Sequence, residues 1–220
     1  MLKTKKDEGL SIRRVQYIYV TLNAAIKQAI RDEITFTNPC AAVKKPKLED
    51  KEQLILSDEQ FELLLKEAKG SEYYVLYELA WDTGMRNGQL LGLPWRNIDF
   101  KRNIIKVSQK VIRTKASGVH ITDKLKSKNS YRDIPITKEV INLLKKHKAK
   151  QSAAICAFGI GYKTMYDLVF PNPDGTPQEP SNLSNDFKKI IRKLGFDDSL
   201  HFHDMRYPNL NKIQTFFKYA

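Results

Sequence analysis

Two short basic stretches, far apart in the chain, carry the residues best suited to chemistry. The first is Thr83-Gly84-Met85-Arg86 and the second is His203-Asp204-Met205-Arg206. A guanidinium offers five N–H donors in a fixed fork, which suits the oxygens of a phosphate or a carboxylate. Arg86 and Arg206 together could therefore hold the non-bridging oxygens of a phosphodiester while negative charge builds up there, without a metal ion.

Arg86 lies at a junction between two expected helices. Apolar residues from Tyr73 to Trp81 recur at the three- and four-residue spacing of a helix face, Gly84 interrupts the pattern, and Leu90 belongs to a second helix. A sharp junction of this kind can hold one guanidinium rigidly at the surface. Taken alone, the same pattern is typical of an ordinary surface arginine.

The two stretches together resemble the tyrosine recombinase, or phage integrase, family. The resemblance rests on Thr-Gly-Met-Arg at 83–86, on the Leu-Leu-Gly-Leu-x-Trp-x-x-Ile-Asp-Phe run at 90–100 and on His-x-x-Arg at 203–206. It covers nearly the whole chain. It implies that Arg86 and Arg206 bind the DNA phosphate, and that His203 is a general base or a phosphate donor. His201 does not fit the motif, and we interpret it as a loop residue.

The resemblance also implies a lysine general acid on a β-hairpin, which protonates the departing 5′ oxygen of the cleaved strand. The corresponding segment runs from Lys124 to Pro135. Family members commonly have a Lys-Thr or Lys-Ser pair ahead of a Ser-x-Arg-x-Ile-Pro end, and this pattern selects Lys126. Lys128 is the alternative because the length of this hairpin varies in the family. A basic hairpin that only touches backbone phosphates is an equally good interpretation of either lysine.

Several residues depart from the family pattern. The family's nucleophilic tyrosine lies well after the second arginine, but Tyr219 stands too early for that spacing. Pro208 would break a helix expected directly after Arg206, and Gln89 stands where a glutamate is usual. We therefore expect a truncated site-specific recombinase that lacks the nucleophile and is inactive alone. Two other hypotheses stay open, namely a tyrosine supplied by another subunit and a non-catalytic basic protein that binds nucleic acid.

The composition predicts a polyanionic partner. The 220 residues carry a net charge of +13 and a pI near 9.6, which favours binding to a polyanion through counterion release. Membrane surfaces are also anionic, so the charge alone does not choose between them and nucleic acid. With the family resemblance, the expected partner is double-stranded DNA at an attachment site, bound by a homo-oligomer that is a tetramer in the intact family. No apolar run is long enough to cross a membrane, so we expect a cytoplasmic, nucleoid-associated protein.

Neither a metal nor a cofactor is indicated by the sequence. The two cysteines, Cys40 and Cys156, stand in unrelated surroundings and form no metal-ligand spacing or disulfide framework. The four histidines include no pair spaced like the zinc ligands of a metalloprotease helix. We expect neither a bound metal nor a cofactor.

The pattern along the chain predicts a mainly helical α+β fold. Residues 49–220 would form the helical catalytic domain of tyrosine recombinases, with a small three-stranded antiparallel sheet. Residues 1–48 would form part of a helical, SAM-like core-binding domain and a linker. We expect helices at 11–34, 57–68, 73–81, 137–147 and 181–194 besides the one that contains Leu90, strand signals at 98–107, 110–112, 121 and 131–136, and irregular structure at 151–180.

Overall fold

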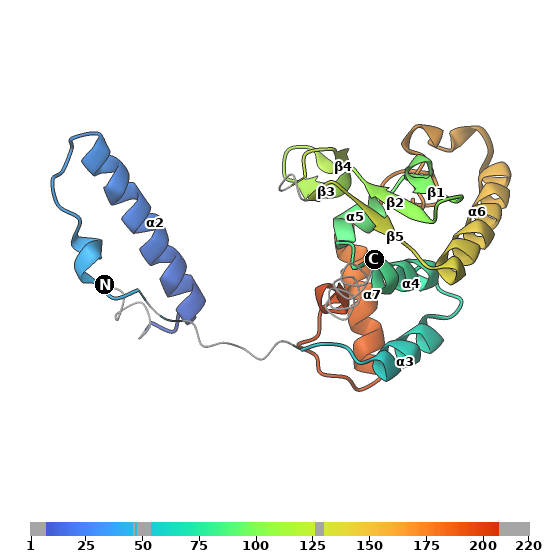
Figure 1. The fold of residues 1–220 in the computed structure, drawn as a ribbon, viewed down its shortest axis with the longest axis horizontal. Helices are drawn as coiled ribbons and strands as arrows, with labels where there is room; N and C mark the ends of the chain where they lie inside the picture. The colour runs from blue at the N-terminus through green and yellow to red at the C-terminus, as the bar shows by residue number, and fades with distance from the viewer. Residues whose placement is uncertain (1–7, 46, 48–53, 126–129, 207–220) are drawn as a thin grey trace. The chain divides into compact units, whose positions relative to one another are not determined.

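A computed structural model describes residues 8–45, 47, 54–125 and 130–206 of the chain (Figure 1). Lys126, Lys128, Pro208 and Tyr219 lie outside these described residues. The chain separates into two compact units, residues 1–53 and residues 54–220. The proposed catalytic residues that the structure describes all belong to the second unit.

The first unit consists of helix α2 (Ile12–Arg31) and the 3-10 turn η1 (Pro39–Ala42). Ser11 caps α2 by accepting the N–H of Arg14. The turn is tied to the helix because the Tyr19 hydroxyl donates to the Cys40 carbonyl at 3.1 Å. The expected helix is thus present, but Val15 is the only residue of its apolar face that is buried among the described residues.

The second unit is a helical domain with strands at one end. Figure 1 shows the strands gathered together, with α3, α4 and α7 at the other end of the unit. The helices are α3 (Asp58–Ala68), α4 (Tyr74–Thr83), α5 (Asn87–Leu91), α6 (Lys138–Phe158) and α7 (Pro180–Lys193), joined by the 3-10 turns η2 (Trp95–Asn97), η4 (Gly159–Gly161), η5 (Thr164–Tyr166) and η6 (Phe202–Arg206).

The strands form two separate antiparallel sheets. β1 (Ile98–Asp99), β2 (Ile104–Val107) and β5 (Arg132–Pro135) form a three-stranded sheet in the order β1-β2-β5, while β3 (Lys110–Thr114) pairs only with β4 (Gly118–Thr122). A small three-stranded antiparallel sheet is present, as expected, but its composition was predicted wrongly. The expected strands at 110–112 and 121 lie outside it and pair with each other as β3 and β4, and the stretch 98–107 is a hairpin and not one strand. Asp99 causes this turn, since its carboxylate accepts the N–H groups of Lys101 and Arg102 at 3.0 and 2.9 Å.

Several predicted helix ends are confirmed by their hydrogen bonds. Ser57 and Gln60 form a reciprocal capping box at the start of α3. At the end of α7, the N–H groups of Gly195 and Phe196 bond to the carbonyls of Arg192 and Ile191, which is the Schellman pattern. Gly195 has a φ of +69°, as a glycine in that position allows.

The prediction of irregular structure from residue 151 was wrong, because α6 continues to Phe158. Its second half buries no residue, so no apolar periodicity marks it in the sequence. Residues such as Gln151 and Ala154 favour a helix by intrinsic propensity. Gln151 also bonds to the Trp95 indole at 2.7 Å and to the Leu168 carbonyl at 3.0 Å, which fixes the helix to the loop beside it.

Candidate functional site

The junction between α4 and α5 is built by its own short hydrogen bonds. The Thr83 hydroxyl is buried and donates to the Leu79 carbonyl, and it accepts the N–H of Met85 at 3.3 Å. Gly84 ends α4 with a φ of +57° and its N–H bonds to the Ala80 carbonyl, a conformation that a Cβ would strain. The chain therefore reverses at a fixed angle and leaves Arg86 at the start of α5.

Arg86 is exposed, while the residues on either side of it are anchored. Met85 is buried in the core. Gln89 is 3% exposed, and its side-chain oxygen accepts the backbone N–H of Arg86 at 3.1 Å. Asn87 donates to the Pro180 carbonyl at 2.9 Å and so ties α5 to α7. The glutamine at position 89 thus serves as a backbone cap, a role that its amide oxygen fills without a charge.

Two glycines let α5 lie directly against strand β3. A Cβ on Gly88 would stand 2.5 Å from the Val111 carbonyl oxygen, and one on Gly92 would stand 2.8 Å from the Lys110 Cα. Real Cβ atoms do not approach backbone so closely. The Gln109 side chain also donates to the Gly92 carbonyl at 2.7 Å. The strands are therefore held close to the helix that begins at Arg86.

The second basic stretch forms the 3-10 turn η6, and its apolar residues attach it to the core. Phe202 and Met205 are buried. The Phe202 ring lies 6.2 Å from that of Tyr77 on α4 and 5.9 Å from that of Phe187 on α7. His203 is exposed, and Arg206 is the last residue of the turn. Residues three apart in a 3-10 helix lie on the same side, so positions 203 and 206 share one side of η6.

The structure thus places both basic stretches on one helical core. Arg86 follows the C-terminal end of α4, and η6 packs through Phe202 on Tyr77 of the same helix. The third element, the lysine hairpin, is described only at its base. There the Tyr131 hydroxyl donates to the Asp123 carbonyl and accepts the N–H of Leu125, so the two ends of the segment that contains Lys126 and Lys128 are joined.

Arg132 is a basic residue to which our sequence analysis assigned no role. It begins β5, directly after the base of the lysine hairpin, and is half-buried. Burial, and to a smaller degree the positive charge of Arg86, lower the pKa of Arg132. The Ser-x-Arg-x-Ile-Pro motif contained the signal for Arg132, because its arginine begins a strand. The next residue of that strand on the same side, Ile134, belongs to the core.

The tyrosines of α4 and its first turn are not suited to nucleophilic attack. The Tyr77 hydroxyl donates to the Asp186 carboxylate at 2.7 Å, and burial together with this bond raises the pKa of Tyr77. Burial, helped by the charges of Glu72 and Asp186, raises the pKa of Tyr73 to about 12. Both side chains are buried in the core, so their roles are structural.

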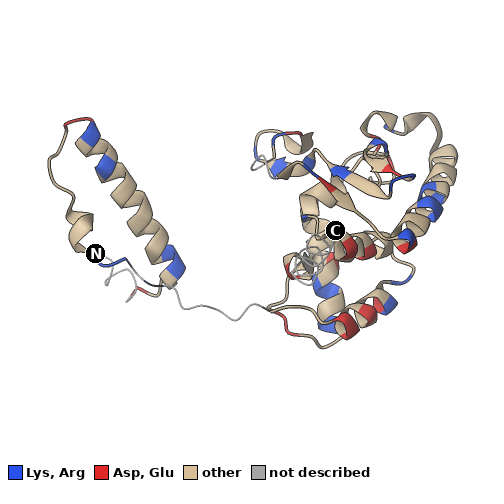
Figure 2. Cartoon of the chain, in the orientation of Figure 1, with Lys and Arg blue, Asp and Glu red and all other residues tan. Residues whose placement is uncertain are grey.

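Charge is unevenly distributed over the second unit. Figure 2 shows acidic residues concentrated on α3 and α4, and basic residues on the strands, their turns and α6. A polyanion would be repelled from the acidic side and attracted to the other. The exposed or half-buried basic side chains around the strands are Arg86, Lys101, Arg102, Lys106, Lys110, Arg113, Lys115, Lys124 and Arg132.

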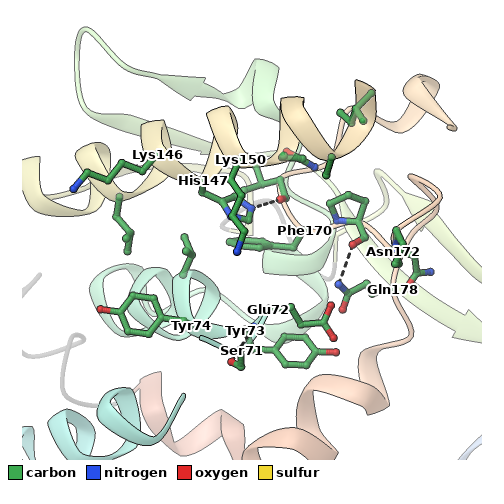
Figure 3. A pocket seen from close by; sticks show the side chains of 18 of the residues that line it. Ser71, Glu72, Tyr73, Tyr74, Lys146, His147, Lys150, Phe170, Asn172 and Gln178 are labelled. Atoms are coloured by element: carbon green, nitrogen blue, oxygen red, sulfur yellow. Dashed lines mark hydrogen bonds between the residues drawn. The ribbon is translucent and has the colours of Figure 1, made fainter. Parts of the chain in front are cut away.

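A cavity of about 470 Å³ lies away from these residues, between the start of α4 and α6 (Figure 3). It includes Tyr73, Tyr74, Lys146 and His147 but none of the proposed catalytic residues. His147 is structural, since its ring contacts Phe170 at 5.3 Å and its Nε2 lies 2.8 Å from the Val169 carbonyl, and burial lowers its pKa. The cavity lies at the start of α4 and Arg86 follows its end, and α4 is about 15 Å long at a rise of about 1.5 Å per residue.

The described residues include no group of three His, Cys, Asp or Glu side chains that could hold a metal ion. Within the same described ranges, no helix is both long and apolar enough to span a bilayer. The exposed guanidinium of Arg86 can bind an anion at an open surface. Such a surface suits a polymer such as a nucleic acid better than a small molecule.

Comparison with known proteins agrees with this picture. The sequence model of the phage integrase family matches residues 54–209. The chain is 28% identical to a "tyrosine recombinase XerC-like" protein of Caldanaerobacter subterraneus subsp. tengcongensis, over 94% of this chain and 56% of that protein. It is 25% identical to the ICEBs1 integrase of Bacillus subtilis, over 93% of this chain and 55% of that protein. The chain thus spans about half the length of these relatives.

Solved structures share the fold at low sequence identity. The Tn1549 transposon integrase, in complex with transposon right end DNA, superposes with a TM-score of 0.77 at 22% identity, over 93% of this chain and 67% of that chain. A lambda integrase dimer bound to a core site superposes with a TM-score of 0.63 at 19% identity, over 93% of this chain and 53% of that chain. The mainly helical fold with a small antiparallel sheet is therefore confirmed, and the chain belongs to the phage integrase family of tyrosine recombinases.

Proposed function

We propose that this chain binds double-stranded DNA at a recombination site, and that Arg86, His203 and Arg206 surround the phosphodiester that tyrosine recombinases cleave and rejoin. The observation that carries the proposal is the exposed Arg86, which is held at a rigid junction and whose guanidinium makes no hydrogen bond or ion pair with any described residue. An arginine fixed in this way can offer all its donors to a ligand.

The role of each residue follows from its chemistry. Arg86 and Arg206 would each give N–H groups to non-bridging phosphate oxygens, which stabilises the negative charge of the transition state. His203, on the same side of η6 as position 206, would donate to the phosphate or accept a proton from the attacking hydroxyl. Lys126 or Lys128 would protonate the departing oxygen.

The DNA would lie on the strand side of the second unit. That side holds Arg86 and the basic residues of the strands, whereas α3 presents acidic side chains (Figure 2). The related lambda integrase has been solved as a tetramer bound to a Holliday junction. By analogy, this chain would act as a homo-oligomer on chromosomal DNA in the cytoplasm.

The test is duplex binding measured by fluorescence anisotropy over a salt series, with Arg86→Ala beside Arg192→Ala. Arg192 is the matched control because it is exposed and already paired with Asp198. A hydrogen bond to a charged group contributes about 1.5–3 kcal/mol, so Arg86→Ala should weaken binding about tenfold to hundredfold. It should also reduce the slope of log K against log salt by about one.

Equal losses for the Arg86 and Arg192 variants would instead support the alternative, a basic protein without a defined phosphate site. A wild-type chain that shows no binding to duplex DNA at low salt would contradict the proposal altogether.

A further inference from the structure

Arg132 stands beside the Arg86 junction although it belongs to a different element. In the β2–β5 pair it lies opposite Val107, and opposite residues of an antiparallel pair have Cα atoms about 4.5–5.5 Å apart. Val107 in turn lines a narrow crevice together with Met85 and Gln89. Arg86 is the neighbour of Met85 in the chain and is capped by Gln89, so Arg132 and Arg86 border the same small region.

Among the residues that the structure describes, these two arginines have no acidic partner. Neither guanidinium makes a hydrogen bond or an ion pair with any residue in the described ranges, whereas Arg113 on β3 pairs with Glu179 at 2.7 Å. Burial and the charge of Arg86 both lower the pKa of Arg132, which shows that the environment of Arg132 disfavours its positive charge. Holding a half-buried cation near another cation costs free energy unless an anion binds between them.

The position of Arg132 is also rigid. Ser130, two residues earlier, is buried, and Tyr131 joins the two ends of the lysine hairpin. After it, Ile134 packs in the core. An arginine held at its backbone in this way loses little further backbone freedom on binding a ligand.

Resting on the proposed function, we propose that Arg132 is a further phosphate-binding residue of the site, and that it and Arg86 together bind one phosphate of the DNA backbone. The two guanidinium forks approach from different elements, the α4–α5 junction and strand β5. Together they would fix the phosphate on the strand side of the unit, next to the lysine hairpin. The phosphate would supply the negative charge that neither side chain finds among the described residues of the free protein.

The experiment compares Arg132→Gln, Arg132→Lys and the control Arg192→Gln in the same duplex-binding assay. Arg192 is a suitable control because it lies on α7, away from the strands, and already has an acidic partner, Asp198. Arg132→Gln should weaken duplex binding about tenfold to hundredfold and lower the salt slope by about one. Arg132→Lys should recover part of the affinity, because it keeps the charge but loses the fork. Arg192→Gln should leave affinity within about twofold of the wild type.

A second measurement separates phosphate binding from a structural role. In phosphate-free buffer, Arg132→Gln should unfold at a higher temperature than the wild type, because it removes an unpaired, half-buried charge. Added inorganic phosphate should stabilise the wild type more than Arg132→Gln. The double variant Arg86→Ala with Arg132→Gln should lose less affinity than the product of the two single losses, because both residues would share one phosphate.

The inference is overturned if Arg132→Gln binds DNA as Arg192→Gln does, or if it lowers the unfolding temperature without a specific loss of binding. Either result would leave the proposed function intact provided that Arg86→Ala still weakens binding. Failure of the wild type to bind duplex DNA would instead overturn the proposed function and this inference together.

Discussion

Phe202→Ala should lower the free energy of unfolding of the second unit by about 3–5 kcal/mol, the usual cost of removing a buried aromatic ring. Phe202 is 4% exposed and contacts the rings of both Tyr77 and Phe187. Together with the buried Met205, this side chain attaches η6 to α4 and α7. Small domains are stable by only about 5–15 kcal/mol, so this loss is large.

The measurement is urea unfolding followed by circular dichroism, with Phe158→Ala as the control. Phe158 is also an aromatic residue, but it is 48% exposed at the end of α6, so its removal should cost under about 1 kcal/mol. At a temperature where Phe202→Ala remains folded, its DNA affinity should also fall, because η6 carries His203 and Arg206. A variant as stable as the wild type would show that η6 is not part of the core.

Gly92→Ala should destabilise the unit by about 1–3 kcal/mol through overpacking. The added Cβ would lie within 2.9 Å of three backbone atoms of Lys110 and Val111, and backbone cannot turn aside as a side chain can. Strand β3 must therefore move away from α5. Because Arg86 begins α5, the variant should also bind duplex DNA more weakly.

Gly161→Ala is the matched control for this change. Its Cβ would meet only the Phe158 ring, at 3.2 Å, and that side chain can rotate away. Gly161→Ala should change the free energy of unfolding by no more than about 0.5 kcal/mol. If Gly92→Ala unfolds at the same urea concentration as the Gly161 variant, the close contact between α5 and β3 is not required for the fold.

Local signals in the sequence were enough to predict the elements that position Arg86. Ser57, Gly84 and Gly195 act through bonds to residues a few positions away, so their effects can be read from a short window of sequence. The turn at Asp99 has the same local origin, but its signal was missed inside a run of β-branched residues.

Contacts between distant parts of the chain could not be predicted in this way. Gly88 and Gly92 are required by strand β3, which lies about twenty residues further along, and nothing near them in the sequence shows this. The same holds for Arg132, which comes near Arg86 only because β5 pairs with β2. The roles of Arg86, His203 and Arg206 came from the family motifs, and they stay predictions until tested.

The central claim is that Arg86 directly contacts a phosphate of duplex DNA. A double-mutant cycle tests it. A duplex that binds tightly is selected first, and its phosphates are then replaced one at a time by uncharged methylphosphonates. The affinity of each modified duplex is measured for the wild type and for Arg86→Ala. We expect one phosphate, or two neighbouring ones, whose replacement lowers the affinity of the wild type about tenfold or more but leaves the affinity of Arg86→Ala unchanged. If every replacement weakens the two proteins equally, Arg86 does not bind a backbone phosphate and the claim is wrong.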